Sequence, residues 1–223
     1  MSRPPVIAID GPAGSGKSTI AQLIAEKLGF VYVDTGAMYR ALTLKALKNN
    51  IDLNDDGGLV AMAKAADITL KNEQGVLKVY LDNKEVTEEI RTPEVTNNTA
   101  YIASVPDLRK VTVKKQRQLG EAGGVVIEGR DTTTVVFPDA DYKFYLDASF
   151  DERVNRRHKQ FMQDNRVVDL QELKQDIKER DEKDKKRKVG GLKKAPDAIY
   201  VDTTNLSIDE VVDKLLSCVK QAG

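Results

Sequence analysis

The sequence has very little histidine, cysteine and tryptophan: its 223 residues include one histidine, one cysteine and no tryptophan. A single histidine nearly excludes catalysis by paired histidines and multi-histidine metal centres. A single cysteine excludes an internal disulfide framework and cannot by itself hold zinc. Chemistry on this chain must therefore rest on lysine, arginine, carboxylates, hydroxyls, backbone amides or a bound ion.

The chain also lacks an excess of charge and a long apolar run. Thirty-five basic residues balance 35 acidic ones, so no global charge draws the protein to nucleic acid or to an anionic membrane. No apolar run approaches the roughly 18 residues of a membrane span, and the first ten residues lack the apolar segment of a secretory signal. We therefore expect a folded cytoplasmic protein with no membrane partner and no stable nucleic-acid partner.

Short apolar runs alternate with helical patterns along most of the chain. We expect strands at residues 6–10, 30–34, 125–128, 142–147 and 198–202, with helices after the first two, at 93–103 and 106–120, and at 207–220. Residues 68–71, 77–81 and 85–90 have the pattern of short antiparallel strands. Together these predict an α/β fold of three layers with a central parallel sheet and a small antiparallel β insertion.

Residues 11–18 have the sequence Gly-Pro-Ala-Gly-Ser-Gly-Lys-Ser, which matches the phosphate-binding pattern G-x-x-x-x-G-K-[ST] between a predicted strand and a predicted helix. The glycines let backbone N–H groups wrap a triphosphate, and the helix adds its positive N-terminal end. Lys17 supplies a cation for the β- and γ-phosphates, and the Ser18 hydroxyl can complete a Mg²⁺ shell. This P-loop predicts a nucleoside-triphosphate site.

Among P-loop proteins, a GTPase or an ATPase motor fits the sequence less well than a small-molecule kinase. Residues 83–86 begin like the guanine-reading Asn-Lys-x-Asp but lack the aspartate. Residues 55–58 fit Asp-x-x-Gly, yet they lie in a loop that no predicted strand precedes. Asp34 could be a motor's metal-side acid, but its strand is short and the chain is small. A kinase remains, and it needs acceptor-binding groups across from the P-loop.

Polar residues follow two further predicted strands at their carboxyl ends, where open α/β sheets bind ligands. They are Asp34-Thr35-Gly36, with Arg40 one turn later, and Gly129-Arg130-Asp131. Guanidinium groups bind pairs of phosphate oxygens, so Arg40 and Arg130 are candidate ligands of an acceptor phosphate. Such an acceptor needs no histidine base, because its second pKa is about 6. Positioning, Mg²⁺ and cations are enough for its phosphorylation.

The charged helical stretch between residues 149 and 188 is a candidate lid. Arg180, Asp184 and Arg187 are spaced by four and three residues, so a helix would place them on one face. A solvated helix face laced with ion pairs is the commoner reason for such a run. Beside a P-loop, however, a mobile segment that folds arginines over the transferred group and excludes water is favoured.

Several motifs together resemble those of the bacterial cytidylate kinases. They are Gly11-Pro-Ala-Gly-Ser-Gly-Lys-Ser, Asp34-Thr-Gly-Ala-Met-Tyr-Arg40, Glu128-Gly-Arg-Asp131, Thr134-Val-Val-Phe-Pro-Asp-Ala140 and Arg180-Asp-x-x-Asp184-x-x-Arg187. The similarity runs essentially end to end and includes the β insertion at 68–91. It implies a P-loop nucleoside monophosphate kinase of pyrimidine nucleotide metabolism, which transfers the γ-phosphoryl group of ATP to CMP or dCMP with Mg²⁺.

The resemblance also implies a role for each matching residue. The residues implied to bind ATP are Gly11, Pro12, Ala13, Gly14, Ser15, Gly16, Lys17, Ser18, Thr19 and Arg157. Those implied to bind CMP are Thr35, Arg40, Arg109, Arg130, Asp131, Arg180, Asp184 and Arg187.

Within these sets, Lys17, Arg40, Arg130 and Arg187 are the catalytic candidates, and Ser18 is the candidate Mg²⁺ ligand, with Asp34 in the next layer around the ion. Arg180 and Asp184 are implied to meet the sugar. Arg109 and Asp131 are implied to read cytosine. A carboxylate accepts a hydrogen bond from the amine of cytosine and repels the oxygen that uracil has there.

The organisation implied by the resemblance is a monomeric single kinase chain. Its core covers residues 1–35, 104–150 and 192–223, its monophosphate-binding domain 36–103 and its lid 151–191. Two alternatives stay open. One is a P-loop kinase for another monophosphate or small metabolite, and the other is an ATP-dependent switch or RNA-binding protein, which leaves Arg40, Arg109 and Arg130 without a shared purpose.

The sequence departs from the family pattern at three places. Ala100 stands where some members have a serine that contacts the base. Thr132-Thr133 stand where an apolar residue and a glycine are expected, and two β-branched residues would stiffen or crowd that turn. Gly190-Gly191 replace a proline-containing lid end, which would loosen the lid.

Overall fold

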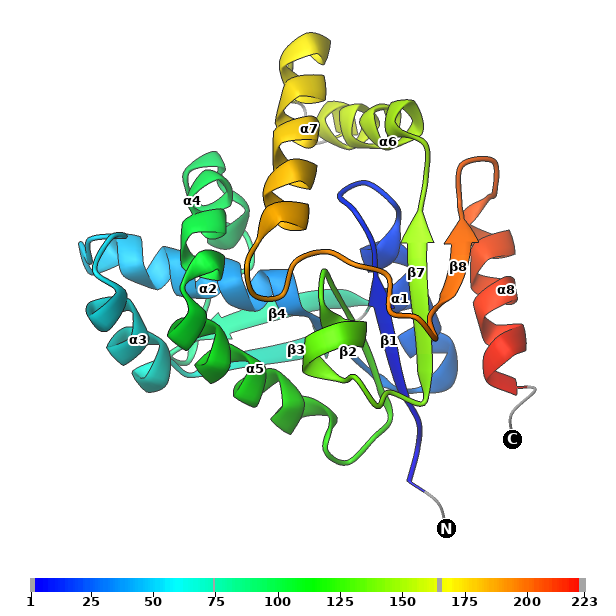
Figure 1. The fold of residues 1–223 in the computed structure, drawn as a ribbon, viewed down its shortest axis with the longest axis horizontal. Coiled ribbons are helices and arrows are strands. Elements are labelled where there is room, and N and C mark those ends of the chain that lie inside the picture. The colour runs from blue at the N-terminus through cyan, green and yellow to red at the C-terminus, as the bar shows by residue number, and fades with distance from the viewer. Residues whose placement is uncertain (1–2, 74, 164–165, 221–223) are drawn as a thin grey trace.

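A central sheet of five parallel strands organises the protein (Figure 1). The computed structural model describes residues 3–73, 75–163 and 166–220. The sheet order is β2-β6-β1-β7-β8, and the strands are β1 Val6–Asp10, β2 Val31–Asp34, β6 Val125–Gly129, β7 Tyr142–Asp147 and β8 Ile199–Asp202. Every residue of β1 and of β6 is buried, as expected for inner parallel strands covered on both faces.

The predicted parallel sheet is confirmed, and its register brings several strand ends to one edge. Asp10 at the end of β1 lies beside Gly129 of β6 and Tyr145 of β7, while Asp34 at the end of β2 lies beside Glu128 of β6. Helices α1 (Lys17–Leu28) and α8 (Ile208–Lys220) pack against each other beside the sheet. The segments that follow β1, β2 and β6 therefore begin close together.

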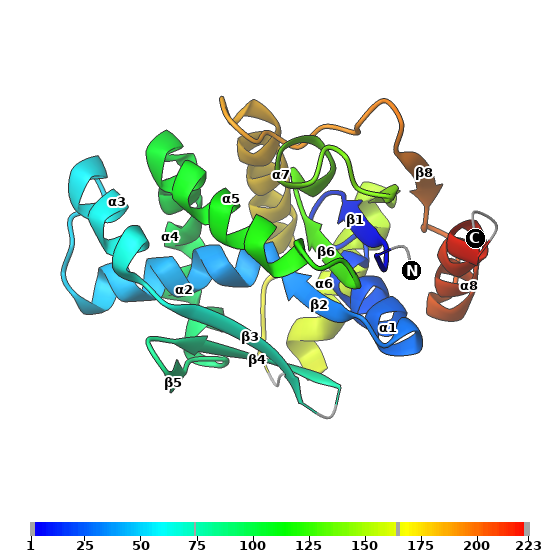
Figure 2. The ribbon, with the colours of Figure 1, turned by 90° about the horizontal axis from the view of Figure 1, so that it is seen from below.

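The predicted antiparallel insertion is a separate sheet of three strands, β3 Ile68–Glu73, β4 Val76–Leu81 and β5 Lys84–Glu85. Figure 2 shows β3 and β4 running beside helix α2 (Thr35–Lys48). The predicted strand at 85–90 is wrong beyond Glu85, because the chain turns into a 3₁₀ helix at Glu89–Arg91. Val86 and Ile90 are both buried, and the Ile90 amide donates to the Val86 carbonyl. Their spacing of four is that of a helical turn, not of a strand.

Three further helices extend this side of the molecule: α3 Asp56–Ala65, α4 Pro93–Ser104 and α5 Pro106–Gly120. Figure 1 shows them grouped around α2, at the left of the view. The prediction of a loop at residues 55–58 is wrong, because α3 begins at Asp56. The helix begins there because the Asp55 carboxylate accepts a hydrogen bond from the Gly58 amide at 3.0 Å, a side-chain cap that offsets the poor helix propensity of Gly57 and Gly58.

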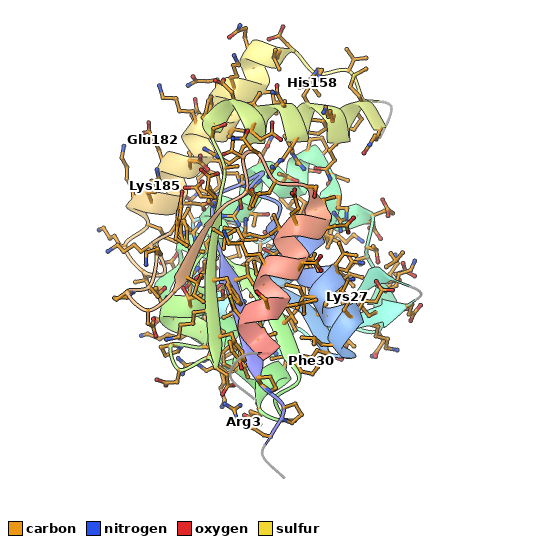
Figure 3. All side chains as sticks on the ribbon, turned by 90° about the vertical axis from the view of Figure 1, so that its right-hand side faces the viewer. Arg3, Lys27, Phe30, His158, Glu182 and Lys185 are labelled. Carbon is orange, nitrogen blue, oxygen red and sulfur yellow. The ribbon has the colours of Figure 1, made fainter. Side chains whose placement is uncertain are left out.

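Two helices, α6 Phe150–Gln163 and α7 Leu170–Lys186, form an arm above the carboxyl ends of the strands (Figure 1). A small apolar cluster of Val154, Leu173 and Ile177 joins them. Figure 3 shows His158, the chain's single histidine, on this arm. Within the described ranges, no helix combines the length and the apolar character that crossing a membrane requires.

Candidate active site

The P-loop between β1 and α1 adopts a conformation that glycine makes possible. Gly14 and Gly16 have φ angles of 78° and 89°, a region that residues with a Cβ rarely adopt. Gly16 leads directly into α1, so the helix's positive end faces the loop. The Lys17 ammonium folds back over the loop and donates to the Pro12 carbonyl at 2.7 Å. Burial, with Arg130 close by, lowers the pKa of Lys17 to about 7.

A buried carboxylate that sequence analysis left unassigned lies next to the P-loop serine. The Ser18 hydroxyl donates to Oε1 of Glu128 at 2.8 Å, and Glu128 faces Asp34 across the register of β6 and β2. Burial and the charge of Asp34 raise the pKa of Glu128. Its signal in the sequence is an acid at the carboxyl end of a predicted strand.

The residues present fit a Mg²⁺ ion that also binds phosphate oxygens. Since Ser18 gives its only proton to Glu128, its oxygen lone pairs remain available to a cation. Asp34 is more engaged, because it accepts from the Ala37 amide at 2.9 Å and from Arg40 at 2.8 Å. Within the described part of the chain, no group of three or more histidine, cysteine or acidic side chains could hold a metal. Mg²⁺ in kinases needs no such cage, because it keeps waters and substrate phosphates as ligands.

Four of the predicted acceptor arginines and their acidic partners do come together at the strand ends. Arg130 and Arg187 share the Asp184 carboxylate, with distances of 2.8 Å from Nε of Arg130 and 2.7 Å from Nη2 of Arg187. Arg40 pairs with Asp34 at 2.8 Å. Arg180 on α7 interacts electrostatically with Lys17 and with Arg130. Arg180 and Asp184 on α7, and Arg187 just after it, thus lie near Lys17 and Arg130, and their role in a lid stays a prediction.

The predicted base-reading residues form a buried ion pair. Arg109 on α5 donates to Asp131, and the two residues are 2% and 5% exposed. The Arg109 guanidinium also lies 5.3 Å from the centre of the Tyr39 ring, a residue of α2 to which sequence analysis gave no role. Burial and the nearby Asp10 raise the pKa of Asp131, against the opposite effect of Arg109. The segment that follows α7, which we call the end of the arm, also contacts this cluster, because its Gly190 lies directly against Arg109 and Asp131.

Three buried polar atoms around these groups lack a hydrogen-bond partner within the described residues. They are the Tyr39 hydroxyl, Nε of Arg40 and Nε of Arg109. Buried polar groups are nearly always paired in folded proteins. Their clustering here, among the paired cations, is typical of a site that receives a polar ligand.

The arginines of α6 take different positions. Arg153 donates to the Ala13 carbonyl of the P-loop at 3.0 Å and pairs with Asp181 of α7 at 2.6 Å. It therefore joins the arm to the P-loop, a contact that sequence analysis missed. Arg157 donates to Gln160 within α6 at 2.6 Å, and its role toward ATP stays a prediction. The Thr35 hydroxyl donates to the Glu128 carbonyl at 2.8 Å, and its role toward CMP also stays a prediction.

Comparison with known proteins adds the decisive observation: the family model described as cytidylate kinase matches residues 7–221. The chain belongs to the cytidylate kinase family. It is 49% identical over 221 residues to a cytidylate kinase of Desulforamulus reducens, with 99% of each chain covered. It is 46% identical over 215 residues to a cytidylate kinase of Bacillus subtilis, with 96% of each covered.

A solved structure shares the fold at much lower similarity. A gluconokinase from Sinorhizobium meliloti superposes with a TM-score of 0.51 at 16% identity, covering 100% of this chain and 95% of that one. The family membership confirms the predicted resemblance, the three-layer P-loop kinase fold and a nucleoside monophosphate kinase, which is a phosphotransferase. The roles of individual residues stay predictions.

Proposed function

We propose that this enzyme transfers the γ-phosphoryl group of ATP to CMP or dCMP, giving ADP and CDP or dCDP. The observation that carries the proposal is the meeting of three elements at one edge of the sheet. These are the P-loop, the arginines paired with Asp184 and with Asp34, and the buried Arg109–Asp131 pair. A donor triphosphate, an acceptor phosphate and an acceptor base each have a matching partner there.

On the donor side, the P-loop amides and Lys17 bind the triphosphate. Lys17 is buried and has a lowered pKa. A bound γ-phosphate would favour the protonated form of Lys17, and the ammonium would then stabilise the negative charge on the phosphoryl oxygens. Ser18 would hold Mg²⁺ with water and phosphate ligands, while Glu128 and Asp34 lie behind it. When bound, the ion neutralises the charge that spreads over the phosphoryl oxygens.

On the acceptor side, Arg40, Arg130 and Arg187 bind the phosphate of the monophosphate. Their present partners, Asp34 and Asp184, keep the three guanidinium groups in place. A guanidinium binds a pair of phosphate oxygens bidentately, as it binds a pair of carboxylate oxygens, so a phosphate dianion can replace these partners. Held against the P-loop, the acceptor oxygen needs orientation and charge screening and no general base.

The base is recognised by Asp131, oriented by Arg109. Asp131 accepts from the exocyclic amine of cytosine, whereas the carbonyl oxygen of uracil at that position would face a carboxylate. A site that loses a hydrogen bond and gains repulsion discriminates strongly, because its buried polar group is left unpaired. The Tyr39 hydroxyl, which has no hydrogen-bond partner among the described residues, belongs to a ring beside Arg109 and is a further candidate to bind the base.

The proposal includes the organisation and context predicted above. Residues 1–35, 104–150 and 192–223 form a core, residues 36–103 a monophosphate-binding domain and residues 151–191 a lid. The enzyme is a cytoplasmic monomer with no stable nucleic-acid partner. The hydrogen bonds of Arg153 to both Ala13 and Asp181 support a lid whose position is coupled to the P-loop.

The test measures ADP release from ATP with Mg²⁺ in the presence of CMP, dCMP, UMP, AMP, GMP, dTMP or no acceptor. The expected result is turnover that strongly favours CMP and dCMP. Replacing Asp131 by alanine should remove that preference, and the matched control Asp139→Ala, at an exposed position, should keep it. Preference for another acceptor would keep the kinase and overturn the acceptor, and slow release independent of any acceptor would favour the ATP-dependent switch.

A further inference from the structure

The last residue of β1 carries a buried carboxylate that the proposed reaction does not use. Asp10 is 0% exposed and immediately precedes the P-loop. Its Oδ1 accepts from the amide and the hydroxyl of Thr132 at 2.8 and 2.7 Å. Its Oδ2 accepts from the amide and the hydroxyl of Thr133 at 2.7 and 2.6 Å. Both oxygens are thus fully occupied, and no ion pair to Asp10 is found within the described residues.

The two threonines directly follow the residues that grip the acceptor. Arg130 and Asp131 end the segment after β6, and the chain then enters a π-helical turn at Thr132–Val136. The Asp131 carbonyl accepts from the Val135 amide at 2.8 Å, so the turn also closes on Asp131 itself. One carboxylate therefore connects the start of the P-loop to the turn that carries Asp131.

The two hydroxyls stand where the family resemblance implies an apolar residue and a glycine. Two β-branched residues there are predicted to stiffen or crowd the turn. The structure instead buries Thr132 and Thr133 almost completely and aims both hydroxyls at Asp10. With an apolar residue and a glycine, only the two amides could bind the carboxylate. Hydrogen bonds to a charged acceptor are stronger than neutral ones, so the added pair should hold the turn more rigidly.

We infer that Asp10 and the hydroxyls of Thr132 and Thr133 form a positioning device that orients Asp131 toward the acceptor base. The inference rests on the proposed function, since it concerns how that site discriminates cytosine. These three residues touch no substrate in this role. They act through Asp131, which can distinguish an amine from an oxygen only while its carboxylate is held in one direction.

The test uses valine, which keeps the branched shape of threonine and lacks the hydroxyl. Thr132→Val, Thr133→Val and the double variant are compared with wild type for KM of CMP, KM of ATP and the ratio of kcat/KM between CMP and UMP. The expected result is a fall of the ratio by about tenfold in the double variant. KM of ATP should stay within about twofold of wild type, because the substitutions leave Asp10 and the P-loop residues that follow it unchanged.

Two controls separate positioning from a general loss of stability. Thr134→Val alters the same turn at a residue whose hydroxyl makes no hydrogen bond to Asp10, and it should leave the ratio unchanged. Thr132→Ser and Thr133→Ser keep the hydroxyl and should retain the wild-type ratio even where the melting temperature falls. Should the double variant fail to fold, the single variants, which each remove one of the four bonds, decide the question.

The outcomes distinguish this inference from the proposed function. A wild-type enzyme without turnover of CMP would overturn the proposed function, and the positioning of a cytosine reader with it. A wild-type enzyme that prefers CMP, together with folded valine variants of unchanged ratio, would overturn the positioning role alone. A loss of the ratio in Thr134→Val equal to that in the other valine variants would overturn it too.

Discussion

Replacing Gly190 by alanine tests whether the end of the arm forms part of the cytosine site. Gly190 has a φ of +66° and follows α7. A Cβ on it would lie 2.7 Å from Cζ of Arg109 and closer still to the guanidinium nitrogen and to Asp131. Arg109 is 2% exposed and paired with Asp131, so it has nowhere to move without breaking that pair. The end of the arm must retreat instead.

The size of the effect follows from two costs. A residue with a Cβ in the left-handed region costs about 1–2 kcal/mol, and the collision adds to this. Taking about 2 kcal/mol as the penalty on the closed arrangement, KM for CMP should rise about 30-fold. Gly29→Ala is a matched control, because Gly29 has the same φ of +66° and no atom within 4 Å of the added Cβ. Gly29→Ala therefore has the free-energy cost of the left-handed backbone without a steric clash. Gly29 also lies at the C-terminal end of α1, far from the P-loop.

The assay is steady-state ADP release with varied CMP at saturating ATP, then with the roles reversed. Gly190→Ala should raise KM for CMP with a much smaller change for ATP, while Gly29→Ala should lower the melting temperature and leave both constants near wild type. A folded Gly190→Ala enzyme with an unchanged KM for CMP would refute the reasoning. A lower KM would refute it as well, because it would mean that Gly190 obstructs the base in the free enzyme.

Three further predictions concern charge at the site. Burial and neighbouring arginines lower the pKa of Lys17 to about 7, so ATP binding should be accompanied by proton uptake at pH 8 and by little proton uptake at pH 6. Calorimetry in buffers of different ionisation enthalpy measures this uptake, and equal uptake at the two pH values would contradict the prediction. Asp184→Asn removes the carboxylate that two arginines share, so the free energy of unfolding measured in urea should fall by about 2 kcal/mol. CMP should restore part of this free energy. An equal fall with and without CMP would count against phosphate binding by those arginines. Arg153 donates to Ala13 and Asp181 from Nη1 and to Ala148 from Nε. Lysine is one bond shorter and has one nitrogen, so Arg153→Lys cannot keep all three contacts, and KM for ATP should rise about fivefold with less change for CMP. Equal rises would show that the arm does not act through the P-loop.

The sequence predicts best those elements whose signal is local and whose surroundings are uniform. The run Val6–Asp10 is predicted correctly as an inner strand, because its largely apolar sequence matches a position where all five residues are buried. The P-loop reads correctly because its glycines and Lys17 serve a backbone conformation that few other residues allow. Helix α3 was not predicted because Gly57 and Gly58 are typical of a turn. The helix is stabilised by the side-chain cap from Asp55 and by packing on α5, which are visible only in the structure.

The acceptor side could be only partly predicted, since its contacts join residues that are distant in the chain. Arg109 has no local signal on its helix and was identified through the family resemblance alone; its partner Asp131 is 22 residues away. Glu128 is near the P-loop only because β6 lies beside β1 and β2. The bonds from Thr132 and Thr133 to Asp10 span more than 120 residues, so a pattern read along the chain indicates crowding where the fold makes hydrogen bonds.

Charge balance explains why so many cations can wait at one site without substrate. Arg40 is held by Asp34, Arg130 and Arg187 by Asp184, and Arg109 by Asp131, while burial and Arg130 lower the pKa of Lys17 to about 7 and so reduce its charge. Unpaired, these buried groups would repel one another and destabilise the fold around the site. In the proposed site, the same carboxylates hold each guanidinium in place, so a substrate phosphate would meet cations that are already oriented. Since the site gives up carboxylate pairing as it gains phosphate pairing, affinity reflects the difference between the two. A free phosphate ion, which brings no base for Asp131 to read, should therefore compete only weakly with CMP.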